Sequence, residues 1–135
     1  MPSNRSRETP EPATGQCFRA FRLPAGPGSV LLMLVGELDL VTAGDASAAI
    51  RRAQARTRAL ICDLGDVWFI DLAGLRVLLD ASARARLAGA RLTVTNCPPI
   101  VADMLAVLRL EGRLDLQAPP PVLASRSSGT GRDLL

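Results

Sequence analysis

The chain has 135 residues, of which 48% are hydrophobic and 21% charged, which suits one domain of ordinary size with a packed core. Its 16 cationic residues are all arginine, and the formal net charge is +3. Because lysine, histidine and tyrosine are missing, the chain lacks the commonest general base, the Schiff-base amine and the usual nitrogen ligand of zinc.

The first segment, residues 1–14, is expected to be a flexible leader, because it is polar, contains prolines and lacks the apolar core of a signal peptide. Two strands are predicted after it, Cys17–Leu23 and Ser29–Val35, with turn-forming residues between them. The longest apolar run, Val30–Val35, is far shorter than the roughly 20 residues that a membrane-spanning helix requires. We therefore expect no membrane association.

Alanine and isoleucine side chains at helical spacing predict a first helix over Thr42–Arg56. Thr42 and Asp45 fit a capping-box-like start of this helix. The apolar segment Ala59–Leu64 predicts a buried strand, and a second helix is predicted over Leu72–Ala88.

The next elements are a predicted strand over Arg91–Thr95 and a third helix over Pro98–Arg109. Asn96 lies near the N-cap of this helix, and an early proline suits its first turn. A short last strand is predicted at Leu114–Leu116. The residues of the third helix that are expected to face inward are Ile100, Val101, Met104, Leu105 and Leu108.

Residues 118–135 begin with three successive prolines and continue with serine, glycine and threonine, which predicts a flexible tail. The folded domain is therefore expected at residues 15–117. Its predicted order is strand, strand, helix, strand, helix, strand, helix, with one further short strand. Single helices between strands imply right-handed crossovers and a parallel portion of the sheet, so the fold class is α/β.

The predicted domain, residues 15–117, is nearly neutral, with twelve arginines and ten acidic residues. The arginines are scattered, and their densest group, Arg51 to Arg58, has no aromatic residues among it. Direct nucleic-acid binding is not expected, because it needs a clustered basic face or aromatic stacking platforms.

The three cysteines, Cys17, Cys62 and Cys97, lie far apart and have no CxxC spacing. Without histidine they cannot form an ordinary zinc site, so we expect neither a metal nor another cofactor. An odd number of cysteines without a signal peptide indicates reduced thiols in a cytoplasm.

Loops at the carboxyl ends of parallel strands gather at one edge of a sheet and carry function. We expect this edge to bring together Gly36–Leu40, Gly65–Leu75 and Asn96–Pro99. Asp71 can accept hydrogen bonds from the free N–H groups of the following helix, and this is also what an ordinary N-cap does. Gly74 in the first helical turn permits the close approach of either another backbone or a partner.

Of the two aromatic residues before this turn, Trp68 and Phe69, we expect one in the core and one partly exposed at an interface.

Two segments, Gly36-Glu37-Leu38-Asp39 and Ile70-Asp71-Leu72-Ala73-Gly74-Leu75, together resemble the STAS domain of anti-anti-sigma factors, also called anti-sigma factor antagonists. The resemblance covers residues 15–117. It implies a small mixed sheet with helices packed against it. It also implies a non-enzymatic protein that binds an anti-sigma factor, a serine kinase of the GHKL ATPase type, and thereby frees a sigma factor.

The resemblance and the expected edge together assign partner binding to nine residues. These are Glu37, Asp39, Trp68, Asp71, Leu72, Ala73, Gly74, Leu75 and Asn96. We expect the protein to be a monomer or a weak homodimer.

In that family the kinase phosphorylates a serine in an Asp-Ser-Ser/Ala/Thr-Gly-Leu motif, which weakens binding by repulsion and desolvation. Here Leu72 and Ala73 occupy the hydroxyl positions, so no phosphorylation is expected there. Three interpretations remain: a constitutive antagonist, which we favour; phosphorylation of another hydroxyl; or a STAS role without phosphorylation. The other hydroxyls considered are those of Thr42, Ser82 and Thr95.

A STAS accessory subunit of a phospholipid-transport ATPase, or a signalling scaffold, is the main alternative. A phosphoacceptor receiver would need a lysine that the chain lacks, and no phosphate-binding GxxxxGK[ST] or GxGxxG loop is present. Asp39 with Asp71 could in principle form an acid–base pair, but no nucleophile–base arrangement accompanies them.

Overall fold

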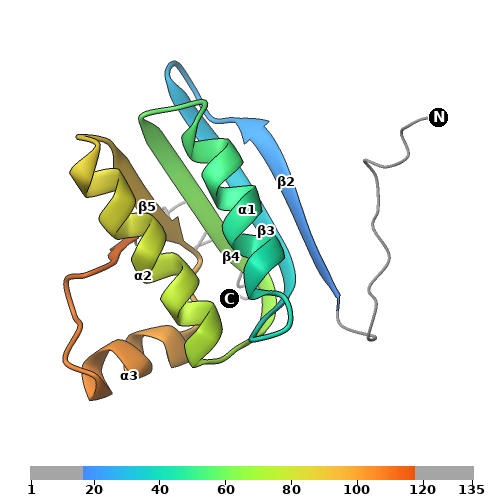
Figure 1. Cartoon of the computed structure of the whole chain (residues 1–135), viewed down its shortest axis with the longest axis vertical. Coiled ribbons are helices and arrows are strands. Elements are labelled where there is room, and N and C mark those ends of the chain that lie inside the picture. Colours follow the sequence, from blue (N-terminus) through green and yellow to red (C-terminus); the bar gives the residue numbers. More distant parts are fainter. Residues whose placement is uncertain (1–16, 118–135) are drawn as a thin grey trace, which may run out of the picture.

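Residues 17–117 are the part of the chain that the structure, a computed structural model, describes (Figure 1). The expected leader and tail lie outside these residues. The elements in chain order are β2 (Phe18–Pro24), β3 (Ser29–Leu38), α1 (Ala43–Gln54), β4 (Ala59–Ile70), α2 (Leu72–Leu87), β5 (Arg91–Thr95), α3 (Pro99–Val107) and β6 (Asp115–Gln117). Each helix and strand predicted from residue 17 onward is present, although several ends differ.

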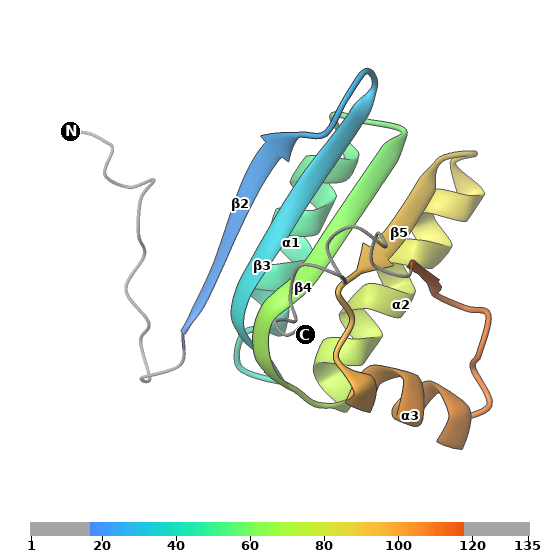
Figure 2. The ribbon, with the colours of Figure 1, turned by 180° about the vertical axis from the view of Figure 1, so that it is seen from behind.

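Within residues 17–117, five strands form one sheet in the order β2-β3-β4-β5-β6. β2 pairs with β3 antiparallel, and the other three pairings are parallel. Helices α1 and α2 lie beside each other on one face of the sheet, as both views of the ribbon show (Figures 1 and 2). The predicted α/β class, a small mixed sheet with helices packed against it, is confirmed.

The hydrophobic core lies between this sheet face and the two helices. Alternate side chains of β3 and of the first half of β4 point toward the helices and are buried. The helices bury alanines together with a few large residues, which lets them pack close to the sheet. The largest fully buried side chains are Leu34, Leu38, Ile50, Leu60, Leu64, Leu75, Leu78, Val94, Val101 and Cys62.

The ends of β3 and β4 differ from the prediction, because both strands continue where loops were expected. β3 extends to Leu38 instead of Val35, and β4 extends to Ile70 instead of Leu64. The register between them shifts twice, between Met33 and Val35 and between Gly36 and Glu37. Beyond Leu64 the buried residues of β4 are three apart, so the alternation on which a strand prediction depends is lost although pairing continues.

The predicted capping box of the first helix is wrong. Thr42 makes no side-chain hydrogen bond to the turn that follows it. Its hydroxyl instead donates to the carbonyl oxygen of Glu37 over 2.7 Å and accepts from the N–H of Asp39 over 3.0 Å. Thr42 thus binds the start of α1 to the end of β3.

The third helix also differs from the prediction. It covers Pro99–Val107 with Pro98 as its N-cap, so it is shorter at both ends than predicted. Ile100 and Leu108 are 48% and 42% exposed, although they were expected to face inward. The reason is the position of α3 beyond the end of the sheet (Figure 1), where only its Val101 and Leu105 side becomes buried.

Candidate functional site

The carboxyl ends of β3 and β4 meet the beginning of α2 at one edge of the sheet, at the bottom of Figure 1. In the parallel register Glu37 lies opposite Phe69, and Leu38 lies opposite Ile70. The N–H of Asp71 then donates to the carbonyl oxygen of Leu38 over 3.1 Å. The two segments that carry the family resemblance are therefore neighbours in space.

At Gly74, α2 comes very close to the backbone of β3. A Cβ atom at this position would overlap the carbonyl group and the side chain of Leu38. Gly74 is buried, and so is the next residue, Leu75. Of the two explanations for this glycine, close packing of one backbone on another accounts for it. Gly74 and Leu75 therefore support the edge from beneath and do not form part of its surface.

Asp71 is the N-cap of α2, as its position in the sequence predicted. Its Oδ1 atom accepts a hydrogen bond from the N–H of Gly74 over 3.0 Å, and its backbone is extended. A carboxylate here satisfies a free donor of the first turn and interacts favourably with the helix dipole. Asp71 thus fixes the direction in which α2 leaves the edge and with it the position of Leu72.

Asp39 organises the loop between β3 and α1. Its Oδ1 atom accepts hydrogen bonds from the N–H groups of Val41 and Thr42, each over 3.0 Å. This geometry is typical of aspartate side chains that close a turn onto their own backbone. The turn holds the exposed side chains of Leu40 and Val41 at the edge of the sheet.

Large apolar side chains are exposed along this edge. Trp68 is 62% and Leu72 57% exposed, and Phe69 is also exposed, so the expectation that one of the two aromatic residues lies in the core is wrong. The irregular register of β4 buries Val67 and Ile70 and leaves both residues between them outside. The exposed apolar residues of this edge are Leu40, Val41, Trp68, Phe69, Leu72 and Ile100.

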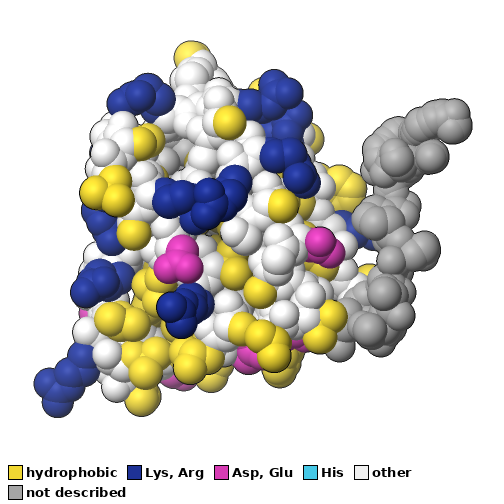
Figure 3. Space-filling model, in the orientation of Figure 1, with side chains coloured by type: hydrophobic (Ala, Val, Ile, Leu, Met, Phe, Trp, Pro, Cys, Tyr) yellow, Lys and Arg dark blue, Asp and Glu magenta, His cyan; other side chains and the backbone are white. Residues whose placement is uncertain are grey.

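We call the surface formed by these six apolar residues and by Glu37, Asp39 and Asp71 the carboxyl edge. Trp68 and Glu37 touch within it, since the indole N–H donates to Oε2 of Glu37 over 3.4 Å. Figure 3 shows hydrophobic side chains gathered along the lower rim of the molecule with acidic groups among them, while most arginines lie higher.

Four members of the carboxyl edge are not among the nine residues assigned to partner binding. Leu40 and Phe69 lie within the segments predicted for this edge, whereas Val41 and Ile100 lie outside them. An available signal was the apolar pair Leu40-Val41 in a predicted loop, where polar residues are the rule.

Asn96 lies one strand further along the sheet. Its backbone has a φ of 54°, and its side-chain amide donates to Oδ1 of Asp63 over 3.0 Å. The same oxygen accepts from the N–H of Gly65 over 2.8 Å. Asn96 is exposed, but this contact directs its amide toward β4, so it connects the end of β5 to the middle of β4.

Two of the alternative phosphorylation sites are inaccessible. Thr42 and Ser82 are buried, with 4% and 3% of their surface exposed. The Ser82 hydroxyl donates to the carbonyl oxygen of Arg113 over 3.0 Å, as the Thr42 hydroxyl does to that of Glu37. Thr95 is half-buried at the end of β5. At the family's hydroxyl positions, Leu72 is exposed and Ala73 half-buried.

Cys62 and Cys97 are free thiols without the environment of a nucleophile. Burial raises the pKa of Cys62 to about 12 and that of Cys97 to about 11, so both remain protonated at neutral pH. Among residues 17–117, no cluster of acidic and cysteine side chains could hold a metal ion. No helix within the same range is long and apolar enough to cross a membrane.

The comparisons with known proteins agree with this geometry. A family model described as "Mlab, STAS domain" matches residues 21–122. No curated protein matches the chain.

Several solved structures share the fold. SpoIIAA of Bacillus in its phosphorylated form is 18% identical, with a TM-score of 0.60 over 78% of this chain and 96% of that chain. An anti-sigma factor antagonist from Mycobacterium paratuberculosis is 22% identical, with a TM-score of 0.63 over 82% and 93% of the two chains. A variant of RsbS from Moorella thermoacetica is 20% identical, with a TM-score of 0.60 over 76% and 88%.

The family model covers most of the chain, and the arrangement of the strands and helices agrees with these structures. The chain therefore belongs to the STAS domain family.

Proposed function

We propose that this protein is an anti-sigma factor antagonist, which binds an anti-sigma factor through the carboxyl edge and thereby frees a sigma factor. The observation that carries the proposal is the exposed apolar surface at the meeting point of the two family segments. Trp68, Phe69 and Leu72 are each exposed there, and large exposed apolar groups of this kind are typical anchors of protein interfaces. Structures of the same fold include proteins described as anti-sigma factor antagonists.

The charge of the carboxyl edge indicates the character of the partner's surface. The carboxyl edge contains Glu37, Asp39 and Asp71, and on the face drawn in Figure 3 most arginines lie away from the lower rim. A complementary partner would present a hydrophobic patch with arginine or lysine around it. The anti-sigma factor is proposed to be a serine kinase of the GHKL ATPase type, and the complex is proposed to form in the cytoplasm.

We also propose that the protein acts only by binding, as a monomer or a weak homodimer. The chain has no histidine or lysine, and the raised pKa values of Cys62 and Cys97 keep both thiols protonated. The carboxylates of Asp39 and Asp71 accept backbone hydrogen bonds within their own turns. These roles are structural and do not form an acid–base pair.

Binding is proposed to be constitutive with respect to the kinase. Leu72 is exposed where the family carries a hydroxyl, and Thr42 and Ser82 are buried in structural hydrogen bonds. Leu72 thus offers a persistent hydrophobic contact that a kinase cannot modify.

Affinity capture from the native cells with mass spectrometry tests the role. Recovery of a kinase-like anti-sigma factor, followed by direct binding of the purified partner, is the expected result. Recovery of a transport ATPase with no anti-sigma factor would instead support the accessory-subunit alternative and contradict the proposal.

A further inference from the structure

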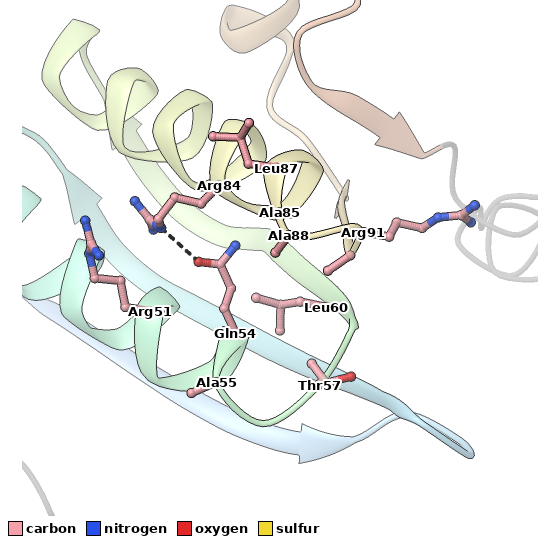
Figure 4. A pocket seen from close by; sticks show the side chains of 11 residues that line it. Arg51, Gln54, Ala55, Thr57, Leu60, Arg84, Ala85, Leu87, Ala88 and Arg91 are labelled. Carbon is pink, nitrogen blue, oxygen red and sulfur yellow. Dashed lines mark hydrogen bonds between the residues drawn. The ribbon is translucent and has the colours of Figure 1, made fainter.

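A second candidate site lies at the opposite end of the molecule from the carboxyl edge. A cavity of about 480 Å³ opens between the C-terminal turns of α1 and α2 and the beginnings of β4 and β5 (Figure 4). Pockets that bind small molecules have volumes of about 300–1,000 Å³. The cavity shares no residue with the carboxyl edge, so whatever it binds would leave the partner surface free.

Two arginines from the helices line this cavity, and no carboxylate is among its lining residues. Arg51 comes from α1 and Arg84 from α2, and in Figure 4 their guanidinium groups lie on the same side, with Gln54 beside them. Among residues 17–117, neither forms an ion pair within 4.0 Å. The pKa of Arg84 is lowered by burial and then by the charge of Arg51, against a smaller opposite effect of Asp80.

The guanidinium group of Arg84 has only part of its hydrogen bonds. Its Nε–H donates to Oε1 of Gln54 over 3.2 Å, and Gln54 is held in place because its amide donates to the carbonyl oxygen of Ala81 over 2.9 Å. The Nη2 atom of Arg84 is buried and has no hydrogen-bond partner among the described residues. A buried donor without a partner is unfavourable, and an anion that reached this guanidinium group would satisfy it.

Two other arginines at this end of the molecule, Arg58 and Arg86, use their guanidinium groups in hydrogen bonds within the protein. Arg58 donates to the carbonyl oxygens of Ala88 and Gly89 over 3.2 and 3.1 Å. Arg86 donates to the carbonyl oxygen of Arg113 over 3.3 Å and to the Ser82 hydroxyl over 3.1 Å. Arg58 thus satisfies carbonyl oxygens of the two residues that follow α2, whereas Arg51 and Arg84 line the cavity.

The rest of the lining is mostly apolar. Leu60 lies at the cavity and is almost completely buried, and Ala85 and Leu87 of α2 and Ala88 just after it continue the apolar lining. Arg91 contributes to the lining, but its guanidinium group points away from Arg51 and Arg84 (Figure 4).

We infer that this cavity binds a small amphiphilic anion, a phosphate or carboxylate joined to a short apolar group. The anionic group would lie between Arg51 and Arg84, where charge-assisted hydrogen bonds are available. The apolar group would lie against Leu60 and Ala88. This site is separate from the carboxyl edge, and the inference does not depend on the proposed function.

Isothermal titration with hexyl phosphate tests the inference on the full chain. We expect saturable binding, weakened about tenfold or more by Arg51→Gln, as loss of a charged hydrogen bond predicts. Arg52→Gln is the matched control, since Arg52 is the exposed neighbour of Arg51, carries the same charge and does not line the cavity. It should bind hexyl phosphate like the wild type.

Arg84→Gln should weaken binding at least as much, and thermal unfolding of each variant checks that it is folded. Should Arg84→Gln not fold, the comparison of the exposed residues Arg51 and Arg52 decides alone. Inorganic phosphate and hexanol should each bind more weakly than hexyl phosphate, because each lacks one part of the ligand. No binding of hexyl phosphate at millimolar concentration, or an equal loss in Arg51→Gln and Arg52→Gln, would overturn the inference.

Discussion

Gly74 illustrates how a single residue determines the carboxyl edge. Its missing side chain lets α2 touch the backbone of β3 at Leu38, and Leu72, two residues earlier, is exposed at the surface. Asp71 completes this junction by capping the helix. The shape of the proposed binding surface thus depends on Gly74 and Asp71. The sequence predicted both as binding residues, and they act through packing and helix capping.

Replacing Gly74 by alanine should destabilise the fold by about 3 kcal/mol, because overpacking against a rigid backbone costs about 1–3 kcal/mol or more. Gly44→Ala is the control, since Gly44 is also in the first turn of a helix and a Cβ there meets nothing within 4 Å. It should leave stability unchanged or raise it by up to about 1 kcal/mol. Urea unfolding measures both, and equal effects of the two changes would contradict the close approach.

Cys62 should make stability depend on alkaline pH. Its pKa is raised from 9.0 in the ordinary thiol to about 12 by burial, so from pH 9 upward the unfolded chain releases a proton that the folded chain retains. The stability that the neutral thiol contributes is complete below pH 9 and is lost as pH rises toward 12. The free energy of unfolding should therefore fall less steeply between pH 9 and 11 in Cys62→Val than in the wild type. Parallel pH profiles would count against a buried, protonated thiol.

Among the helices and strands, β4 is the one whose extent the sequence predicted least accurately. In its first half buried and half-buried side chains alternate, and the sequence predicts this half as a strand. In its second half, from Gly65 to Ile70, the buried residues are three apart, and the sequence predicts a loop. The difference arises from two register shifts against β3, which depend on the partner strand and leave no period in the sequence. For the same reason the exposure of both Trp68 and Phe69 could not be predicted.

The helices were predicted better, because apolar residues at helical spacing are a local signal. Which side of a helix is buried depends on its neighbours, however. α3 lies beyond the end of the sheet, so Ile100 and Leu108 remain exposed although the pattern placed them inward. The Asp71 cap and the family segments were predictable because they depend on residues close in sequence, whereas the arginine cavity joins α1, α2, β4 and β5 and has no sequence signal.

Amide hydrogen exchange should distinguish the extended strand from a loop. The N–H of Asp71 donates to the carbonyl oxygen of Leu38 and closes the pairing of β4 with β3, so it should exchange slowly. The N–H of Leu40, in the exposed loop after β3, is the reference for fast exchange. Exchange of Asp71 at the rate of Leu40 in an NMR time course would show that β4 ends earlier.

The two candidate binding sites of the molecule lie at its opposite ends. The carboxyl edge is apolar and acidic, and the other end carries the arginine-lined cavity. A partner on the first and a small anion on the second could be bound together, since the two sites share no residue.

The absence of a hydroxyl at the helix start predicts the response to a kinase. Incubation of the wild type with the anti-sigma kinase and ATP should leave its intact mass unchanged, while a double variant with Leu72→Ser and Ala73→Ser restores the family pattern and should gain about 80 Da, the mass of a phosphoryl group. A gain of this size in the wild type would contradict constitutive binding and direct attention to Thr95.

The affinity of the purified anti-sigma factor for Leu72→Lys tests the central claim most directly. Leu87→Lys is the matched control, because Leu87 is an exposed leucine at the other end of the same helix. A lysine at position 72 should weaken binding by about 2 kcal/mol, roughly 30-fold, as loss of an interface anchor does. Leu87→Lys should bind like the wild type. If the two variants bind equally well, the carboxyl edge is not the surface through which this protein holds an anti-sigma factor.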